Sequence, residues 1–375
     1  MSLRQEFVEL ARQEGANVRA LCRDFGISPK TAYKWINRFQ ASNGDVASLA
    51  DRSRRPLNSP LRSGDAAQQA VVVLRQAHPA WGGRKIAAAL MQQGSHQLSP
   101  STVTHILHRH ELIDPAASEL ARPWHRFEHA HPNSLWQMDF KGHFQTLAGR
   151  CHALTVLDDH SRFNLLLHAQ TSATAESVRA PLIAVFRRYG LPMRINTDNG
   201  PPWGSPSSGG ESLSTLAVWL IRLGIRISFS APYHPQTNGK IERFHRTLNV
   251  EVLTTKNFAD ASSAQRTFDT WRTTYNCRRP HEALAMGLPV QRYEPSKLPY
   301  RETLAPIEYP SGDLVLKVDS KGFFKLNGRR IRASKALRGQ TIALRPNAKV
   351  DGVHDLYFCH QPFMQVNLHE WTPDT

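Results

Sequence analysis

The spacing of apolar side chains in the first 40 residues predicts three short helices. Apolar residues recur every three or four positions as far as Gly26, where the second helix is expected to end. The third helix is expected to start at Ser28 and Pro29, because serine is a good N-cap and proline suits the first helical position. Its inward stripe consists of Ala32, Trp35, Ile36 and Phe39.

Short helices, a glycine turn and a capped basic helix are typical of a helix-turn-helix motif, whose second helix reads the major groove of DNA. The polar residues on the outward face of the third helix are candidates for contacting DNA: Lys30, Thr31, Lys34 and Arg38. A plain three-helix core with a solvated, lysine-rich face is the alternative interpretation.

The Ser-Pro-x-Thr opening returns at residues 99–102, after a stripe formed by Ile86, Leu90 and Met91. We therefore expect a second helix-turn-helix unit, in which Ser101 and Thr102 are DNA-binding candidates. The segment 41–65 between the two units has few apolar residues and predicts a linker. Its arginines suit either a minor groove of DNA or a solvated tether: Arg52, Arg54, Arg55 and Arg62.

From about residue 134 the pattern changes to short apolar runs that predict strands alternating with helices. We expect strands at 135–141, 153–159, 163–168, 194–197 and 226–229, and helices at 175–189, 213–223 and from 236 onward. This order predicts a mixed sheet in an α/β layout. After residue 304, alternating residues separated by glycines predict short strands that form a small β-barrel.

Charge narrows the possible partners. Lysine and arginine number 47 against 31 acidic residues, a net charge of +16, which favours a polyanionic partner. No apolar run approaches the roughly 20 residues that a membrane span needs, so DNA is favoured over a membrane. Residues 1–25 do not resemble a signal peptide, and a bacterial cytoplasmic, nucleoid-associated location is expected. The four cysteines are far apart, which argues against a disulfide scaffold.

Three carboxylates in the α/β segment stand out. Asp139 is flanked by aromatic and apolar residues in a predicted strand, where a charge is costly unless a cation compensates it. Asp198 follows a predicted strand, although Asp-Asn-Gly is also a good turn sequence. Glu242 lies near the start of a helix. The pair Asp158 and Asp159 is expected to be only a turn between two strands.

These stretches resemble a known family. The set Trp-x-Met-Asp-Phe at 136–140, Thr-Asp-Asn-Gly at 197–200 and His-Pro-Gln-Thr-Asn-Gly-Lys-Ile-Glu-Arg at 234–243 resembles the Asp-Asp-Glu core of retroviral-type integrases and bacterial insertion-sequence transposases. Residues 276–284 are similar to the segment that follows this core, and residues 49–56 are similar to the linker of the same transposases. The resemblance extends over nearly the whole chain.

The resemblance implies a multidomain protein with helix-turn-helix domains at 1–64 (with a basic linker) and 65–118, an RNase H-like integrase core at 119–303 and an SH3-like β-barrel at 304–375. It assigns metal binding and catalysis to Asp139, Asp198 and Glu242. Three such carboxylates suit Mg²⁺, with Mn²⁺ able to substitute, and in-line phosphoryl transfer. It also implies double-stranded DNA as substrate, both terminal inverted repeats and target, and a homo-oligomer, at least a dimer, on paired ends.

Two departures from the family pattern are visible. The separation of Asp198 and Glu242 is longer than in retroviral integrases, and the excess falls in the loop 204–214, which can lengthen at little cost. Many such transposases carry a basic residue where this chain has Asn249, and Arg246 is expected to contact DNA instead. A non-catalytic DNA-binding regulator and a stand-alone RNase H-like nuclease are the rival interpretations.

Overall fold

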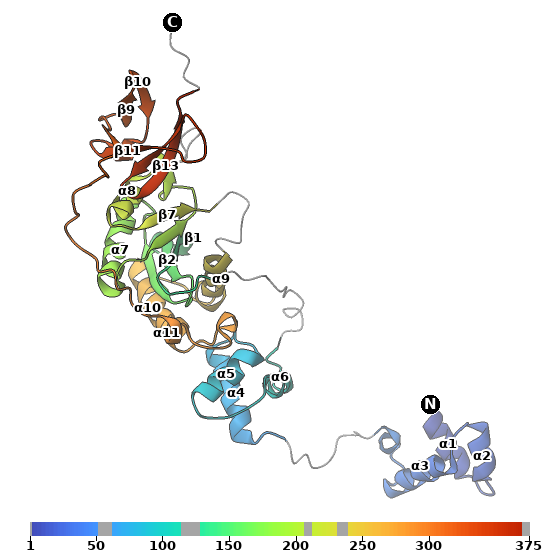
Figure 1. Cartoon of the computed structure of the whole chain (residues 1–375). Coiled ribbons are helices and arrows are strands. Elements are labelled where there is room, and N and C mark those ends of the chain that lie inside the picture. Colours follow the sequence, from blue (N-terminus) through green and yellow to red (C-terminus); the bar gives the residue numbers. More distant parts are fainter. Residues whose placement is uncertain (1, 52–61, 114–127, 206–211, 231–238, 370–375) are drawn as a thin grey trace. The chain divides into compact units, whose positions relative to one another are not determined.

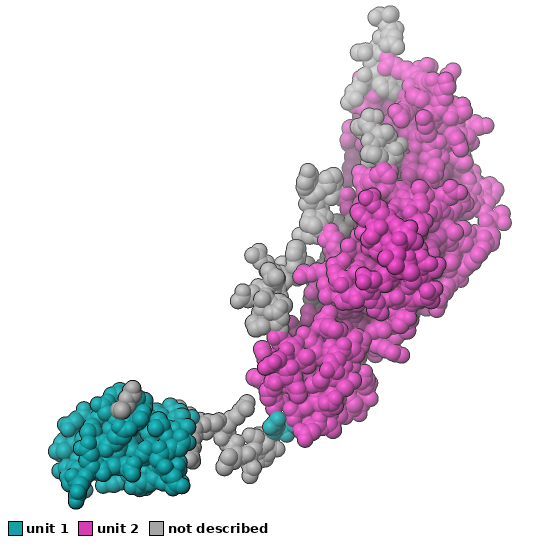
Figure 2. Space-filling model, turned by 180° about the vertical axis from the view of Figure 1, so that it is seen from behind, with its two compact units in different colours: residues 1–63 teal, residues 64–375 magenta. Residues whose placement is uncertain are grey.

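The computed structural model describes residues 2–51, 62–113, 128–205, 212–230 and 239–369. The chain divides into two compact units, Met1–Ser63 and Gly64–Thr375 (Figures 1 and 2). The four domain ranges given above stay predictions.

The first unit contains the three helices that the apolar spacing predicts. They are α1 (Leu3–Ala11), α2 (Val18–Asp24) and α3 (Pro29–Ala41), followed by the short η1 (Val46–Leu49). The Ser28 side chain accepts from the Thr31 N–H, so the predicted cap of α3 is confirmed. Leu49, placed in the predicted linker, is 2% exposed and belongs to the core of this unit. The packed part therefore extends further than its composition indicates.

The second unit begins with three more helices. These are α4 (Asp65–Ala77), α5 (Gly83–Gln92) and α6 (Pro100–Arg109), and Ser99 caps α6 as predicted. Ile86 and Leu90 are buried in their shared core. Met91, expected in the same stripe, is 60% exposed, because it lies on the opposite side of α5 from Ile86.

A five-stranded mixed sheet follows, in the order β3-β2-β1-β4-β7. Its strands are β1 (Trp136–Thr146), β2 (Gly149–Asp158), β3 (Asn164–Gln170), β4 (Arg194–Thr197) and β7 (Arg226–Phe229). The first three pair antiparallel, with Asp139 opposite Thr155, and β4 is parallel to both β1 and β7. The predicted meander and mixed sheet are confirmed.

Helices cover both faces of the sheet (Figure 1). On one face α7 (Ala175–Tyr189) and α8 (Thr215–Arg222) pack on Trp136 and Met138. On the other, α9 (Gly239–Leu248), η3 (Asn249–Leu253) and α10 (Ala261–Cys277) share a second apolar cluster with β2 and β3. Leu213, expected in the helix, instead lies in β6 (Ser212–Leu213), which pairs with β5 (Gly204–Ser205), because Ser214 caps α8 just after it.

Side chains of α10 occupy hydrogen-bonding positions along the edge strand β3. The Asn276 amide accepts from the Asn164 N–H and donates to the Asn164 carbonyl, at 2.9 and 3.0 Å. Gln265 accepts from the Ala169 N–H at 2.8 Å. Unpaired backbone groups at a sheet edge are prone to pair with other chains, so these amides both anchor α10 and protect the edge.

The chain then passes through η4 (Glu282–Leu284) and α11 (Pro289–Arg292) to a C-terminal β domain. A four-stranded antiparallel sheet has the order β13-β12-β11-β8, and β9 and β10 form a separate hairpin beside η5. The bounds are β8 (Leu314–Lys317), β9 (Phe323–Leu326), β10 (Arg329–Arg332), η5 (Lys335–Leu337), β11 (Thr341–Pro346), β12 (Val353–Phe358) and β13 (Gln361–Asn367). The predicted short strands are confirmed, and β12 and β13 are additional.

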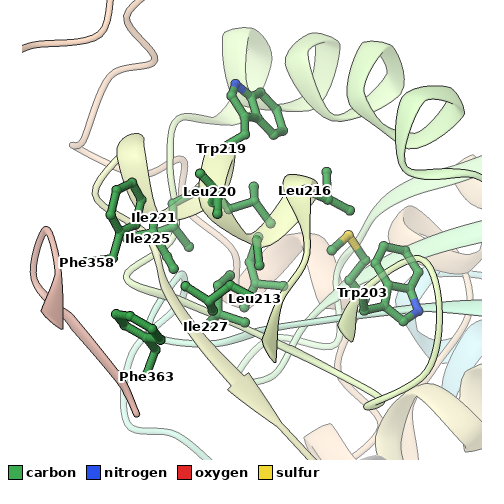
Figure 3. Packing of buried hydrophobic residues seen from close by; sticks show 14 of the residues in the cluster. Trp203, Leu213, Leu216, Trp219, Leu220, Ile221, Ile225, Ile227, Phe358 and Phe363 are labelled. Carbon is green, nitrogen blue, oxygen red and sulfur yellow. The ribbon is translucent and has the colours of Figure 1, made fainter. Parts of the chain in front are cut away.

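This β domain packs on the core beside α8 and β7. Phe358 and Phe363 lie against Ile225 and Ile227 in one apolar cluster (Figure 3). The Gln361 side chain accepts from the Ile227 N–H at 3.1 Å, so the second edge of the sheet also carries an amide. None of the helices in the described ranges is long and apolar enough to cross a membrane.

Candidate active site

Asp139 and Glu242 lie on elements that pack against each other. Asp139 is in β1, and α9 lies across β1 and β2. Ile241, Phe244 and Leu248 form the buried stripe of α9, as the spacing predicts. Because Glu242 follows Ile241 directly, it lies beside that stripe at the exposed side of the helix start.

Asp139 has the electrostatic environment of a cation site. Its side chain is 24% exposed, and its Oδ1 accepts the Phe140 N–H at 2.8 Å. Burial, and after it the negative charges of Asp198 and Glu242, raise the pKa of Asp139 to about 7, against the opposing effect of the Phe140 hydrogen bond. The fold therefore brings both Asp198 and Glu242 within electrostatic range of Asp139.

Asp198 occupies the turn after β4. Its Oδ1 accepts the Gly200 N–H at 3.1 Å, and partial burial raises the pKa of this carboxyl although the residue has an exposed side. Trp203, five residues further on, is 3% exposed and stacks on Phe140 with ring centroids 5.4 Å apart, so it packs in the core and is not available to stack on DNA bases.

The donor set suits a hard divalent cation, because it consists of carboxylate oxygens around a partly buried group whose ionised form is disfavoured. Within the ranges that the structure describes, no three His, Cys, Asp or Glu side chains are close enough together to hold a metal ion as placed.

His245, one turn after Glu242, joins α9 to the hairpin that carries Asp139. Its Nε2 is 2.7 Å from Thr155 Oγ1, which donates to the Asp139 carbonyl at 2.8 Å. Burial lowers the pKa of His245 to about 3, and Lys141 contributes in the same direction. The imidazole is therefore neutral at physiological pH.

The turn after β2 lies where the sequence predicts it, but its two carboxylates are buried. Asp158 and Asp159 do lie at the end of β2 and in the turn, but they are 0% and 2% exposed. Asp159 Oδ1 accepts from the Gln137 amide, and Lys240 Nζ is 2.5 Å from Asp159 Oδ2. Sequence reasoning missed Gln137, although strand alternation places it on the same face as Asp139.

The DNA-binding candidates lie on helix surfaces where they are described. Lys30, Lys34, Ser101 and Arg246 are exposed. Thr31 and Thr102 hydroxyls bond to the capping serines of their own helices, at 2.9 and 2.8 Å, which gives both a local role. The remaining helix candidate, Arg38, is partly exposed on α3. The linker candidates Arg52, Arg54 and Arg55 lie outside the described residues.

Family models match in the same order as these structural parts. A helix-turn-helix domain matches residues 3–56 and a homeodomain-like domain matches 31–107. Two integrase core domain models match 129–235 and 223–289, and the C-terminal domain of IS481 family transposases matches 313–373.

Relatives of the chain come from insertion elements and retroviruses. A 39.2 kDa protein of insertion element IS476 from Xanthomonas euvesicatoria is 30% identical over 43% of this chain and 44% of its own length. A 31.7 kDa protein of IS407 from Burkholderia multivorans is 28% identical over 41% and 52%. The Gag-Pro-Pol polyprotein of simian retrovirus SRV-2 is 34% identical over 31% and 6%. The chain thus covers about half of the insertion-element proteins and a small part of the polyprotein.

Two solved structures are similar at low sequence identity. The simian T-cell lymphotropic virus intasome in complex with a PP2A regulatory subunit has a TM-score of 0.40 and 19% identity, over 76% of this chain and 91% of that one. The HTLV-2 integrase catalytic core with magnesium has a TM-score of 0.34 and 18% identity, over 44% and 99%. The family models and the insertion-element relatives confirm the resemblance to bacterial insertion-sequence transposases with an integrase-like core.

Proposed function

We propose that this chain, which carries the domains of a bacterial insertion-sequence transposase, binds the terminal inverted repeats of its own element and catalyses DNA strand cleavage and strand transfer. The two helix-turn-helix units would bind the repeats, and Asp139, Asp198 and Glu242 would form the reactive site. The observation that carries the proposal is the raised pKa of Asp139, to which the other two carboxylates contribute. Perturbed carboxylates that share a site are typical of catalytic centres.

The three carboxylates would bind the metal, and main-chain N–H groups would orient two of them. Asp139, Asp198 and Glu242 would hold Mg²⁺ through carboxylate oxygens, and Mn²⁺ would substitute for it. When bound, the metal supplies Lewis-acid stabilisation and activates a water or 3′-hydroxyl for in-line attack on a phosphate. The Phe140 and Gly200 N–H groups orient the first two carboxylates.

Basic residues would receive the DNA. Arg246 is exposed one turn after Glu242, where a guanidinium would bind a backbone phosphate next to the reacting one. Asn249, at the family's usual basic position, lies at the start of η3 and supplies no charge. Because two ends of an element must react together, the active form would be a homo-oligomer, at least a dimer, on paired DNA ends, acting in the bacterial cytoplasm.

Joining of a labelled terminal-repeat oligonucleotide to target DNA by the full-length chain tests the proposal. Asp139→Asn keeps the shape of the side chain but removes a charge, so joining should fall by about 10⁴-fold or more while DNA binding survives. Asp198→Asn and Glu242→Gln should behave alike, and their losses should not add. Ca²⁺ should support binding with little joining.

Glu176→Gln is the matched control, because it neutralises an exposed carboxylate on α7. It should join DNA at the wild-type rate. Near-normal joining by Asp139→Asn, or undiminished joining in excess EDTA, would exclude the metal-dependent reaction. Nicking without joining would favour the nuclease, and binding with neither reaction would favour the regulator.

A further inference from the structure

The first turn of α9 is fastened to β1 by a side chain of the strand. Gln137 Oε1 accepts the Ile241 N–H at 3.0 Å, and both residues are buried. The first four N–H groups of a helix have no partner within the helix, so Gln137 satisfies one of them from outside. Gln137 precedes Asp139 by two residues on β1, and residues two apart face the same side of a sheet. The bond therefore joins the helix start to the strand beside Asp139.

Asp159 binds both Gln137 and Lys240, the residue before Ile241. The Gln137 Nε2 donates to Asp159 Oδ1 at 3.0 Å, and Lys240 Nζ lies 2.5 Å from Asp159 Oδ2. Asp159 is 2% exposed and the Lys240 side chain is 15% exposed, so both charges are largely removed from water. The His129 N–H also donates to Asp159 Oδ2, at 3.0 Å. One carboxylate thus fixes the two residues that precede Glu242, Lys240 directly and Ile241 through Gln137.

We propose that Gln137, Asp159 and Lys240 form a positioning unit that sets the place of Glu242 relative to Asp139. The proposal rests on the proposed function, since it concerns the carboxylates assigned to strand transfer. None of the three residues needs to touch DNA or metal. They act through the main chain of α9, at the point where a small displacement of the helix start would move Glu242 with it.

A purely structural contribution is the competing explanation, although a buried ion pair is often no more stabilising than a well-packed apolar pair. The neighbouring Asp158 separates the two explanations. It is 0% exposed and accepts hydrogen bonds from the Asn133 N–H at 2.7 Å and from the Ser161 N–H at 2.7 Å. Within the described residues the hydrogen bonds of its side chain go to Asn133 and Ser161, not to α9. Asp158→Asn therefore disturbs an equally buried carboxylate of the same segment without releasing the helix.

The experiment uses the full-length chain with Gln137→Met, Lys240→Met, the double variant and Asp158→Asn. Methionine keeps the apolar part of either side chain and removes its polar end. Three quantities are measured: affinity for a terminal-repeat oligonucleotide, the single-turnover joining rate at saturating DNA, and hydrogen exchange of peptides that contain residues 239–248.

Each methionine variant should join DNA about 10- to 100-fold more slowly, with affinity changed by no more than about twofold, because a misplaced reacting group affects rate more than binding. The double variant should be little slower than the slower single variant, since both changes release the same helix start. Amide exchange in the first turn of α9 should accelerate in both. Asp158→Asn should melt at a lower temperature and keep wild-type joining and α9 exchange.

Unchanged joining by Gln137→Met despite faster exchange would overturn the positioning role, as would unchanged exchange in both methionine variants. An affinity loss in Lys240→Met that equals its loss of rate would make Lys240 a DNA contact and would also overturn it. Lys240→Met leaves Gln137 in place, so it decides the matter even if Gln137→Met does not fold. Failure of the wild-type chain to join any DNA would refute the proposed function, and the exchange rates would still show whether Gln137 and Lys240 hold the start of α9.

Discussion

Thr155→Val tests the second connection between α9 and the Asp139 hairpin. Thr155 is fully buried, and its single hydroxyl proton goes to the Asp139 carbonyl. His245 Nε2, at 2.7 Å, must therefore donate to Thr155 Oγ1, so the neutral imidazole carries its proton on Nε2. Valine has nearly the shape of threonine but accepts no hydrogen bond. The substitution leaves the His245 N–H buried and without this acceptor.

The expected loss follows from these two bonds. A buried donor left without a partner costs about 1 to 3 kcal/mol, and the lost Thr155 bond to the Asp139 carbonyl costs about 1 kcal/mol more. A total of about 2 to 4 kcal/mol corresponds to a melting temperature lower by about 5 to 15 °C for a domain of this size. The bond between His245 and Thr155 also holds α9 in place one turn after Glu242, so the rate of DNA joining should fall about tenfold.

Thermal melting of the full-length chain by circular dichroism gives the first number. Thr146→Val is the matched control, because Thr146 lies in the same hairpin and donates to the Gly149 carbonyl at 2.8 Å, a bond within the hairpin itself. It should cost less than about 1 kcal/mol. Adding His245→Phe to Thr155→Val should recover part of the loss, since both partners are then apolar. A wild-type melting temperature for Thr155→Val, or no recovery in the double variant, would show that the hydrogen bond between His245 and Thr155 does not hold α9 in place.

Two further predictions concern other parts of the chain. Lys34→Ala removes an exposed charge of α3 and should weaken binding of the terminal repeat by about 1 kcal/mol or more, as measured by fluorescence anisotropy. If the wild-type chain binds a scrambled sequence as tightly as the terminal repeat at physiological salt, recognition by this helix is contradicted. Burial, with Arg279 adding, lowers the pKa of His281 from 6.5 to about 3, so below pH 6.5 the unfolded chain binds a proton that the folded chain does not. The free energy of unfolding should therefore decrease from pH 6.5 toward pH 3, and His281 alone should account for about 2 kcal/mol of this decrease at pH 5. Between pH 7 and pH 5 the melting temperature of His281→Gln should drop less than that of the wild type. Equal drops would contradict a neutral, buried His281 in the folded chain.

Local signals were sufficient for most of the fold. Ser28 and Ser99, each followed by proline, fixed the starts of α3 and α6, because a capping side chain and a preset φ act within one turn of the chain. Apolar runs located the strands of the sheet for a similar reason. Where the expectation was wrong, as for Met91 and Leu49, burial depended on which side of an element met its neighbour, and spacing over a few residues does not define that side.

The candidate site was predictable only in part. Asp139 stood out as a carboxylate in an apolar strand, but Asp198 and Glu242 were assigned through the resemblance to the Asp-Asp-Glu core, since Asp-Asn-Gly alone also predicts a turn. The catalytic role of all three stays a prediction. The hydrogen bonds that Gln137 makes to Ile241 and Asp159 could not be predicted, because nothing in the sequence distinguishes this neutral amide from other polar residues of a strand. Asp159 was predicted to be a turn residue. Its burial is explained by the ion pair with Lys240, a residue far away in the sequence.

The supports of the carboxylates differ, and this has a mechanical consequence. Asp139 and Glu242 lie on elements joined twice, through Gln137 at the start of α9 and through His245 one turn later. Asp198 is supported locally, by the Gly200 N–H on its carboxylate and by the Thr197 hydroxyl on its carbonyl. Local turn bonds break at less cost than a strand and a helix separate, since only a few residues must rearrange. If the three carboxylates bind a shared cation as we propose, we therefore expect the turn after β4 to move more readily than α9.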